Sequence, residues 1–341
     1  MSELIQDKPP GMGAGFTPLG DIPKPKSAVV GWEPLPMPAQ QTNLENKQSR
    51  PAIPRSPNNY IAYTSDRPEI QGSTITLGRV DVVHLGQTTA YCCPSQETID
   101  SYQGNLSHGQ DATSISVIGD RFILTESDGV GSAYLSHIAA QEATSSIAAD
   151  PSLSLQKNLQ TATDALRQVE LPEPNSGNSL TDTAWRELRE KEGSETMLNQ
   201  LIVNSKTGEV EDGLFLGDGG LTVLRTDGSR EHYPPPEALE SENVKNRTSS
   251  RLSTKRGVRG QTRSLEEVVG KKIVLSSGDS ILLYSDSMQH VVKGKLLIDQ
   301  VCDVIVSEGD DKDAKLATLF EEAAKIDIND DDKTLIRYVQ L

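Results

Sequence analysis

The sequence predicts an α+β fold in which antiparallel sheets are flanked by helices. Short apolar, strand-like runs come early in the folded region and return later, and helix-forming segments are gathered between them. A sheet with one apolar face and a helix with one apolar stripe must each bury that surface against another element. Runs of strands separated by helices therefore fit layers of antiparallel sheet covered by helices.

Alternating apolar and polar residues, or short apolar runs beside turn residues, indicate the strands. Residues 74–85 alternate in this way and are predicted to form a strand. Residues 113–118 and 121–125 flank Gly119-Asp120, which predicts a β-hairpin with a two-residue turn. Apolar runs predict further strands at residues 201–203, 214–216, 221–224, 281–284 and 334–341.

The helices follow from a different composition. Residues 132–149 are rich in Ala and contain neither Gly nor Pro, and Asp150-Pro151 ends the segment, so a helix is predicted there. Further helices are predicted at residues 156–169, 181–192, 295–306 and 313–326.

The N-terminal segment has a different composition from the rest of the chain. Twelve of the 19 prolines lie within residues 1–70, among Asn, Gln, Ser and Lys and with little apolar periodicity. Such a segment buries too little surface to offset its ordering entropy, so we expect a disordered or PPII-like tail, followed by a folded domain at residues 71–341. Its proline clusters at residues 23–26 and 34–38 are either ligands for a partner or parts of a solvated tether.

Composition excludes several classes of protein. The formal net charge of −16 argues against a surface that binds nucleic acid. The three cysteines form no Cys-x-x-Cys motif, so the sequence suggests neither a disulfide framework nor a zinc site. The N-terminus lacks the features of a signal peptide, and no apolar stretch is long enough to span a bilayer. We therefore expect a cytoplasmic protein with no membrane contact.

Four aspartate-containing motifs follow one another along the chain. Three of them lie where an apolar, strand-like run meets a turn. Asp and Gly mark ordinary turns as well, but carboxylates brought together from several strand ends form all-oxygen sites for hard divalent cations. The four motifs are Gln110-Asp111-Ala112, Asp128-Gly129-Val130-Gly131, Ser285-Asp286-Ser287 and Asp331-Asp332-Lys333-Thr334.

Together with two glycine motifs, these segments resemble the PPM/PP2C family of metal-dependent Ser/Thr protein phosphatases, in its bacterial form. The resemblance covers roughly residues 75–341, and it rests on six segments in the family's order. It implies an α/β/β/α sandwich, with two central antiparallel sheets flanked by helices. The six segments are 110–112, 128–131, 193–196, 217–219 (similar to a Gly-Asp-Ser hairpin), 278–286 and 331–334.

The resemblance also implies a site and a reaction. Two Mn²⁺ or Mg²⁺ ions would activate a water that attacks the phosphoester directly, on a phosphorylated protein that is a Ser/Thr kinase or one of its targets. The protein is expected to act as a monomer. The implied metal ligands are Asp128 (bridging), the Gly129 carbonyl, Asp286, Asp331, Asp111 (through metal-bound water) and Asp218 (for a third ion).

One expected residue is missing from the pattern. The family usually has an arginine that binds the substrate phosphate about four residues before its first acidic motif. Leu106 stands there, and no Lys or Arg occurs between residues 87 and 120. A bidentate arginine–phosphate contact is not replaced by a distant lysine. His108 lies beside the motif and is one candidate for this role.

The basic segment at residues 245–263 offers other candidates. It holds seven Lys or Arg and no acidic residue, and the resemblance equates it with a mobile flap beside the active site. It either attracts the phosphorylated substrate or is a solvated basic loop or nucleic-acid patch. Arg251 and Arg256, near its centre, are the candidates for phosphate contact.

Two functions follow from these observations. One is an active metal-dependent phosphatase, and the other is a phosphatase-fold module that binds metals or phosphoproteins without turnover. The presence of Asp128, Asp286 and Asp331 together favours the enzyme, because a scaffold does not need mutually repelling carboxylates.

Overall fold

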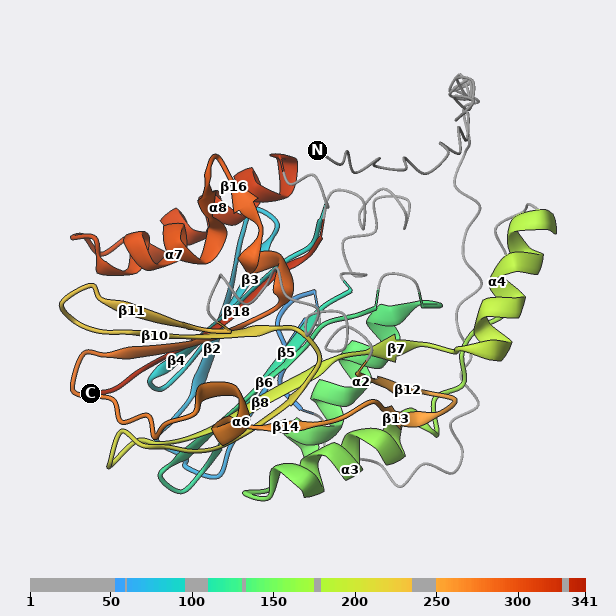
Figure 1. The fold of residues 1–341 in the computed structure, drawn as a ribbon, viewed down its shortest axis with the longest axis horizontal. Helices are drawn as coiled ribbons and strands as arrows, with labels where there is room; N and C mark the ends of the chain where they lie inside the picture. The colour runs from blue at the N-terminus through green and yellow to red at the C-terminus, as the bar shows by residue number, and fades with distance from the viewer. Residues whose placement is uncertain are drawn as a thin grey trace, which may run out of the picture. The chain divides into compact units, whose positions relative to one another are not determined.

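Two large β-sheets pack face to face in the computed structural model of the chain, with helices on their outer faces (Figure 1). The structure describes residues 53–58, 60–95, 110–130, 133–174, 179–234, 250–326 and 331–341. All of them belong to one compact unit, residues 49–341. Within these described ranges, no helix is both long and apolar enough to cross a membrane.

The first sheet has six strands, in the order β1-β5-β6-β8-β9-β14. Neighbouring strands are antiparallel, except that β1 and β5 are parallel. The strands are β1 (Ile61–Ser65), β5 (Ala112–Ile118), β6 (Arg121–Ser127), β8 (Leu198–Asn204), β9 (Val210–Leu216) and β14 (Arg263–Ser264).

The second sheet has seven antiparallel strands, in the order β11-β10-β15-β18-β4-β3-β2. They are β2 (Gly72–Leu77), β3 (Val80–Leu85), β4 (Thr88–Cys93), β10 (Gly220–Leu224), β11 (Arg230–Tyr233), β15 (Ser280–Tyr284) and β18 (Lys333–Val339). A smaller sheet joins β13 (Gly257–Arg259), β12 (Arg251–Ser253) and β7 (Glu195–Thr196), and a two-stranded one joins β16 (Val291–Val292) and β17 (Lys295–Leu296).

The layer between the two large sheets is a hydrophobic core. Phe122 of β6 and Tyr338 of β18 meet there with ring centroids 5.3 Å apart. Leu201 from the first sheet and Leu283 from the second are fully buried in the same layer. Each fully buried side chain of this size contributes about 1.5–3 kcal/mol. This packing sets how the sheets lie on each other, and so where their strand ends meet.

Helices cover both outer faces. Helices α2 (Ser136–Ala149) and α3 (Leu155–Leu166) pack on the six-stranded sheet, where the small side chains of Ala139 and Ala143 allow close approach. Helices α7 (Leu297–Val306) and α8 (Lys312–Ile326) pack on the seven-stranded sheet. Helix α4 (Ser179–Lys191) lies at the right edge of Figure 1, and α6 (Leu265–Val269) follows β14. These layers confirm the predicted α+β sandwich.

Most predicted elements are present, with their ends shifted by a few residues. The hairpin around Gly119-Asp120 is β5–β6, and β8, β9, β10 and β15 contain four of the other predicted apolar runs. The last predicted run, residues 334–341, overlaps β18, which ends at Val339. The five predicted helices correspond to α2, α3, α4, α7 and α8.

Two strand predictions were wrong. Residues 74–85 are not one strand, because the chain turns at Gly78, whose φ of +61° suits glycine, and β2 then pairs with β3. Residues 217–219 do not close a hairpin, because β9 belongs to the six-stranded sheet and β10 to the seven-stranded one. The turn therefore carries the chain from one sheet to the other.

The boundary expected at residue 70 is too late. Strand β1 lies before it, pairs with β5 and carries the fully buried Ile61 next to buried Tyr60. Residues 1–52, which include both proline clusters, lie outside the described residues, so the expectation of a disordered tail stays a prediction.

Candidate metal centre

Three aspartates from distant parts of the chain meet between the two sheets. Asp128 directly follows β6, Asp218 lies in the turn between β9 and β10, and Asp286 comes two residues after the end of β15. Each offers a carboxylate oxygen, and these oxygens lie within 4.8 Å of one another. All three residues were singled out from the sequence. The crossing of the chain between the sheets explains how Asp218 reaches the other two.

The loop that carries Asp128 is held by the 193–196 motif. Thr196 donates from its hydroxyl to the Asp128 carbonyl at 2.7 Å, and the Met197 N–H donates to the same oxygen at 2.7 Å. The Val130 N–H donates to the Glu195 carbonyl at 3.1 Å. Short β7 therefore fixes the backbone on both sides of Gly129.

Gly129 also brings the first acidic motif to this loop. Its N–H donates to Asp111 Oδ1 at 3.3 Å. A Cβ at this position would lie 2.3 Å from the Gln110 carbonyl oxygen, so no larger residue fits without a backbone shift. Asp111 is 2% exposed and therefore lies beneath the Asp128 loop.

The last motif completes the group through two adjacent aspartates. The Asp332 carboxylate accepts hydrogen bonds from the Ser95 N–H at 2.7 Å, the Asp111 N–H at 3.2 Å and the Gln110 N–H. Asp332 therefore ties the first acidic motif to the start of β18.

Asp331 is close enough to Asp286 for their charges to interact. Lys333 is fully buried and donates from Nζ to the Asp331 carbonyl.

Burial makes these carboxylates poor acids in the absence of a cation. It raises the pKa of Asp111, Asp128 and Asp331 well above the usual range, and repulsion from neighbouring carboxylates raises it further. The buried oxygens Asp111 Oδ2 and Asp286 Oδ1 have no hydrogen-bond partner among the described residues. Buried carboxylate oxygens without a donor are the ligands that a hard divalent cation requires, so the residues fit a metal ion.

Sequence reasoning missed Glu126. It is fully buried, and Asn199 donates from Nδ2 to its Oε2 at 2.7 Å. Burial raises the pKa of Glu126 to about 8, and the charges of Asp286 and Asp218 act in the same direction. The available signal was its position two residues before Asp128, near the end of β6, because side chains two residues apart in extended chain share one face.

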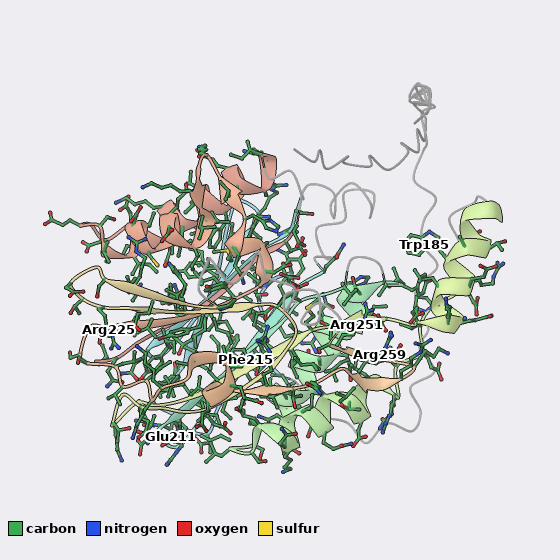
Figure 2. The ribbon with its side chains drawn as sticks, viewed as in Figure 1. Trp185, Glu211, Phe215, Arg225, Arg251 and Arg259 are labelled. Atoms are coloured by element: carbon green, nitrogen blue, oxygen red, sulfur yellow. The ribbon has the colours of Figure 1, made fainter. Side chains whose placement is uncertain are left out.

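The described part of the basic segment forms a hairpin, β12–β13, whose arginines bind glutamates. Arg251 Nη1 lies 3.0 Å from Glu195, and Arg259 Nη1 lies 3.1 Å from both Glu195 and Glu192. Arg256 Nη1 lies 3.4 Å from Glu192. Figure 2 shows Arg251 and Arg259 on the same side of the molecule. A phosphate that reached Arg251 or Arg256 would compete with these carboxylates.

Several residues named from the sequence lie outside the described ranges. They are Leu106, His108 and Gly131, and the residues 245–249 at the start of the basic segment. The roles inferred for them stay predictions.

Residues 101–321 match the profile of the family described as Protein phosphatase 2C. The chain therefore belongs to the protein phosphatase 2C family, whose members are protein serine/threonine phosphatases. No curated protein sequence matches the chain.

Solved structures that resemble the chain include three phosphatase-fold proteins. PstP/Ppp of Mycobacterium tuberculosis is 15% identical, with a TM-score of 0.47 over 74% of this chain and 98% of that one. MsPP of Mycobacterium smegmatis, solved with cacodylate, is 17% identical, with a TM-score of 0.44 and the same two coverages. RsbX in complex with magnesium is 10% identical, with a TM-score of 0.45 over 78% of this chain and 98% of that one.

Proposed function

We propose that the protein is a phosphatase that hydrolyses serine and threonine phosphoesters on proteins, and that Mn²⁺ or Mg²⁺ ions at the Asp128–Asp218–Asp286 cluster are required. The observation that carries this proposal is the approach of three carboxylate oxygens to within 4.8 Å of one another. Unneutralised carboxylates at this separation repel one another, so the arrangement gains from bound cations. When bound, the ions would supply an activated water and neutralise phosphoryl oxygens.

Several residues of the chain would serve as ligands of these ions, each with a different role. We assign Asp128 as the central ligand, with Asp286 and Asp331 beside it and the Gly129 carbonyl as a further ligand. Asp111 would act through metal-bound water, with its Oδ1 held by the Gly129 N–H and its Oδ2 without a donor among the described residues. Asp218 would hold a third ion. A carboxylate oxygen of Asp218 lies within 4.8 Å of oxygens of both Asp128 and Asp286.

The second candidate function is a phosphatase-fold module that binds phosphoproteins with weak or no turnover. It is favoured by the state of the candidate phosphate-binding residues, since Arg251 and Arg256 are both paired with glutamates. The two functions share the same expected partner, a phosphorylated protein such as a Ser/Thr kinase or its target. We expect the protein to act as a monomer.

Hydrolysis of an aryl phosphate and of a phosphoserine peptide by the purified protein tests the proposal. We expect turnover with Mn²⁺ or Mg²⁺ that stops on chelation and returns on re-addition of metal. Asp286→Asn should abolish it, whereas Asp227→Asn, in an exposed turn, should not. Turnover that persists in excess chelator would exclude the metal mechanism. Tight binding of the phosphopeptide without turnover would favour the module.

A further inference from the structure

A cavity of about 460 Å³ lies outside the carboxylate cluster, beside the basic hairpin. Its walls come from the end of α3 and the segment after it, from α4, and from the β12–β13 turn at Thr254 and Lys255. Pockets that bind ligands commonly measure about 300–1,000 Å³. The cavity is therefore large enough for a side chain with its flanking peptide.

The lining of this cavity is cationic. Arg167, Arg189 and Lys255 line it, against one carboxylate, Glu170. A positive wall on a chain with a formal charge of −16 is a local reversal of the protein's overall charge. Such a reversal attracts an acidic ligand that most of the surface would repel.

Two of the three cations are available to a ligand. Arg167 reaches Asp164 only at 3.5 Å, and its side chain is 58% exposed. Across the described ranges, Lys255 forms no ion pair, in contrast to the neighbouring Arg256. Arg189 serves a different purpose, because it donates to the Leu171 carbonyl at 2.8 and 3.1 Å and pairs with Glu173. Arg189 therefore holds the cavity wall in place, whereas the positive charges of Arg167 and Lys255 are available to a ligand.

Two glycines make room for the Lys255 and Arg167 side chains to pack closely against the backbone. Gly193 has a φ of +74°, and a Cβ there would lie 2.8 Å from Lys255 Cγ, so the lysine stem crosses the Gly193 backbone. Gly257 has a φ of +65°, and a Cβ there would lie 3.1 Å from Arg167 Nη2. The Lys255 side chain therefore packs against the backbone at Gly193, and the Arg167 side chain packs against the backbone of the hairpin at Gly257.

The cavity wall is connected to the Asp128 loop by hydrogen bonds. The Thr254 N–H donates to the Ser194 carbonyl at 3.0 Å, and the Ser194 N–H donates to Thr254 Oγ1 at 3.0 Å. Two residues further on, Thr196 donates to the Asp128 carbonyl at 2.7 Å. A ligand held at the hairpin turn is therefore held by the same short sheet that positions the candidate metal ligand.

We infer that this cavity is a docking subsite for an acidic segment of the phosphoprotein substrate, contacted by Arg167 and Lys255. The inference rests on the proposed phosphatase function and names the kind of substrate that it prefers. Substrates with Asp, Glu or a second phosphate near the target phosphoester would bind more tightly than neutral ones. The subsite contributes to KM, while the carboxylate cluster determines kcat.

The test compares two phosphoserine peptides that differ only in a flanking run of Asp and Glu or of Asn and Gln. The double variant Arg167→Gln/Lys255→Gln is assayed on both peptides and on an aryl phosphate. We expect KM to rise roughly tenfold for the acidic peptide and less than about twofold for the neutral peptide and the aryl phosphate. The matched control is Lys295→Gln/Lys325→Gln, which removes the same charge near α7 and at the end of α8.

A second readout separates failure of the subsite from failure of catalysis. Fluorescence anisotropy measures binding of the acidic sequence without its phosphate to the Mn²⁺-loaded protein, and only the cavity variant should weaken it. If no substrate is hydrolysed, the proposed catalysis fails while this measurement still decides on the cavity. Equal effects on both peptides, or none, would overturn the inference. So would a cavity that only binds inorganic phosphate, seen as phosphate-induced thermal stabilisation lost in the variant, with unchanged peptide preference.

Discussion

Two groups of acidic side chains, connected through β7, differ in the charges that surround them. At the hairpin, the Glu195 side chain is 2% exposed and lies 3.0–3.1 Å from two arginines. At the carboxylate cluster, Asp128, Asp218 and Asp286 face one another with their oxygens within 4.8 Å. A buried charge is tolerated when it is paired. The hairpin supplies arginines as partners for Glu195, whereas the carboxylates of the cluster lie against one another, an arrangement that a bound cation would stabilise.

The strongest challenge to this contrast is Asp128→Asn, which removes one charge from the cluster and keeps its shape. We expect Mn²⁺ affinity and kcat/KM to fall by about 100-fold or more, because the central ligand is lost. The metal-free variant should unfold at the same temperature as the parent or a higher one, because repulsion is relieved. Calorimetric titration with Mn²⁺ and thermal unfolding in chelator measure both. Undiminished Mn²⁺ binding would remove Asp128 from the site.

The hairpin should respond in the opposite direction. Glu195→Gln leaves Arg251 and Arg259 without their buried partner, and it should lower the free energy of unfolding by about 2 kcal/mol. The loss should be the same with and without Mn²⁺, since this pairing does not involve a metal. Urea denaturation in both conditions checks the prediction. A variant as stable as the parent would show that the arginines find other partners.

The pH dependence of the metal-free protein sharpens the comparison further. The pKa values of Asp111, Asp128 and Asp331 are raised, and that of Glu126 is raised to about 8, so the folded state binds protons more tightly than the unfolded chain. Stability from these groups is therefore fully present below about pH 4 and is lost as pH rises through the folded pKa values.

Glu126→Gln removes one of these titrating groups, so the metal-free variant should lose less stability than the parent as pH rises. In chelator at pH 8 to 9, we expect its melting temperature to exceed that of the parent by roughly 2–4 °C. The difference should shrink towards pH 4, where the carboxyl is largely protonated in both states. Scanning calorimetry across this range measures it, and Glu209→Gln, at a partly exposed ion pair, is the control. Identical pH profiles would mean that Glu126 does not interact with the cluster.

The smallest effect is expected at Glu192, which shares Arg259 with Glu195 but is 23% exposed. Water already screens this pair, so Glu192→Gln should cost less than about 1 kcal/mol. The ratio of its effect to that of Glu195→Gln reports how much of the hairpin's stability comes from burial. Equal losses in urea denaturation would contradict this explanation.

Some of the architecture was readable from local patterns alone. The Gly119-Asp120 hairpin and five helices could be predicted because their signals, turn residues and the absence of Gly and Pro, lie within each segment. The hairpin at Gly78 was missed because alternation continues on both sides of the turn. Strand β1 was missed because it is short and lies in a proline-rich neighbourhood.

The acidic motifs were also readable, since aspartates beside apolar runs are a local feature. Their order along the chain identified the family and three of the carboxylates that the structure brings together. The missing arginine was equally visible as an absence between residues 87 and 120.

What the sequence determined by itself was thus the set of elements and the acidic residues at their ends. Only the tertiary structure decided which of these residues meet. Asp218 reaches Asp128 because β9 and β10 pair in different sheets, and Glu195 holds Arg251 because β7 pairs with β12. Glu126 became a neighbour of the cluster because the sheets pack face to face. Strand partners and charge partners depend on contacts across long stretches of chain, and no local pattern encodes them.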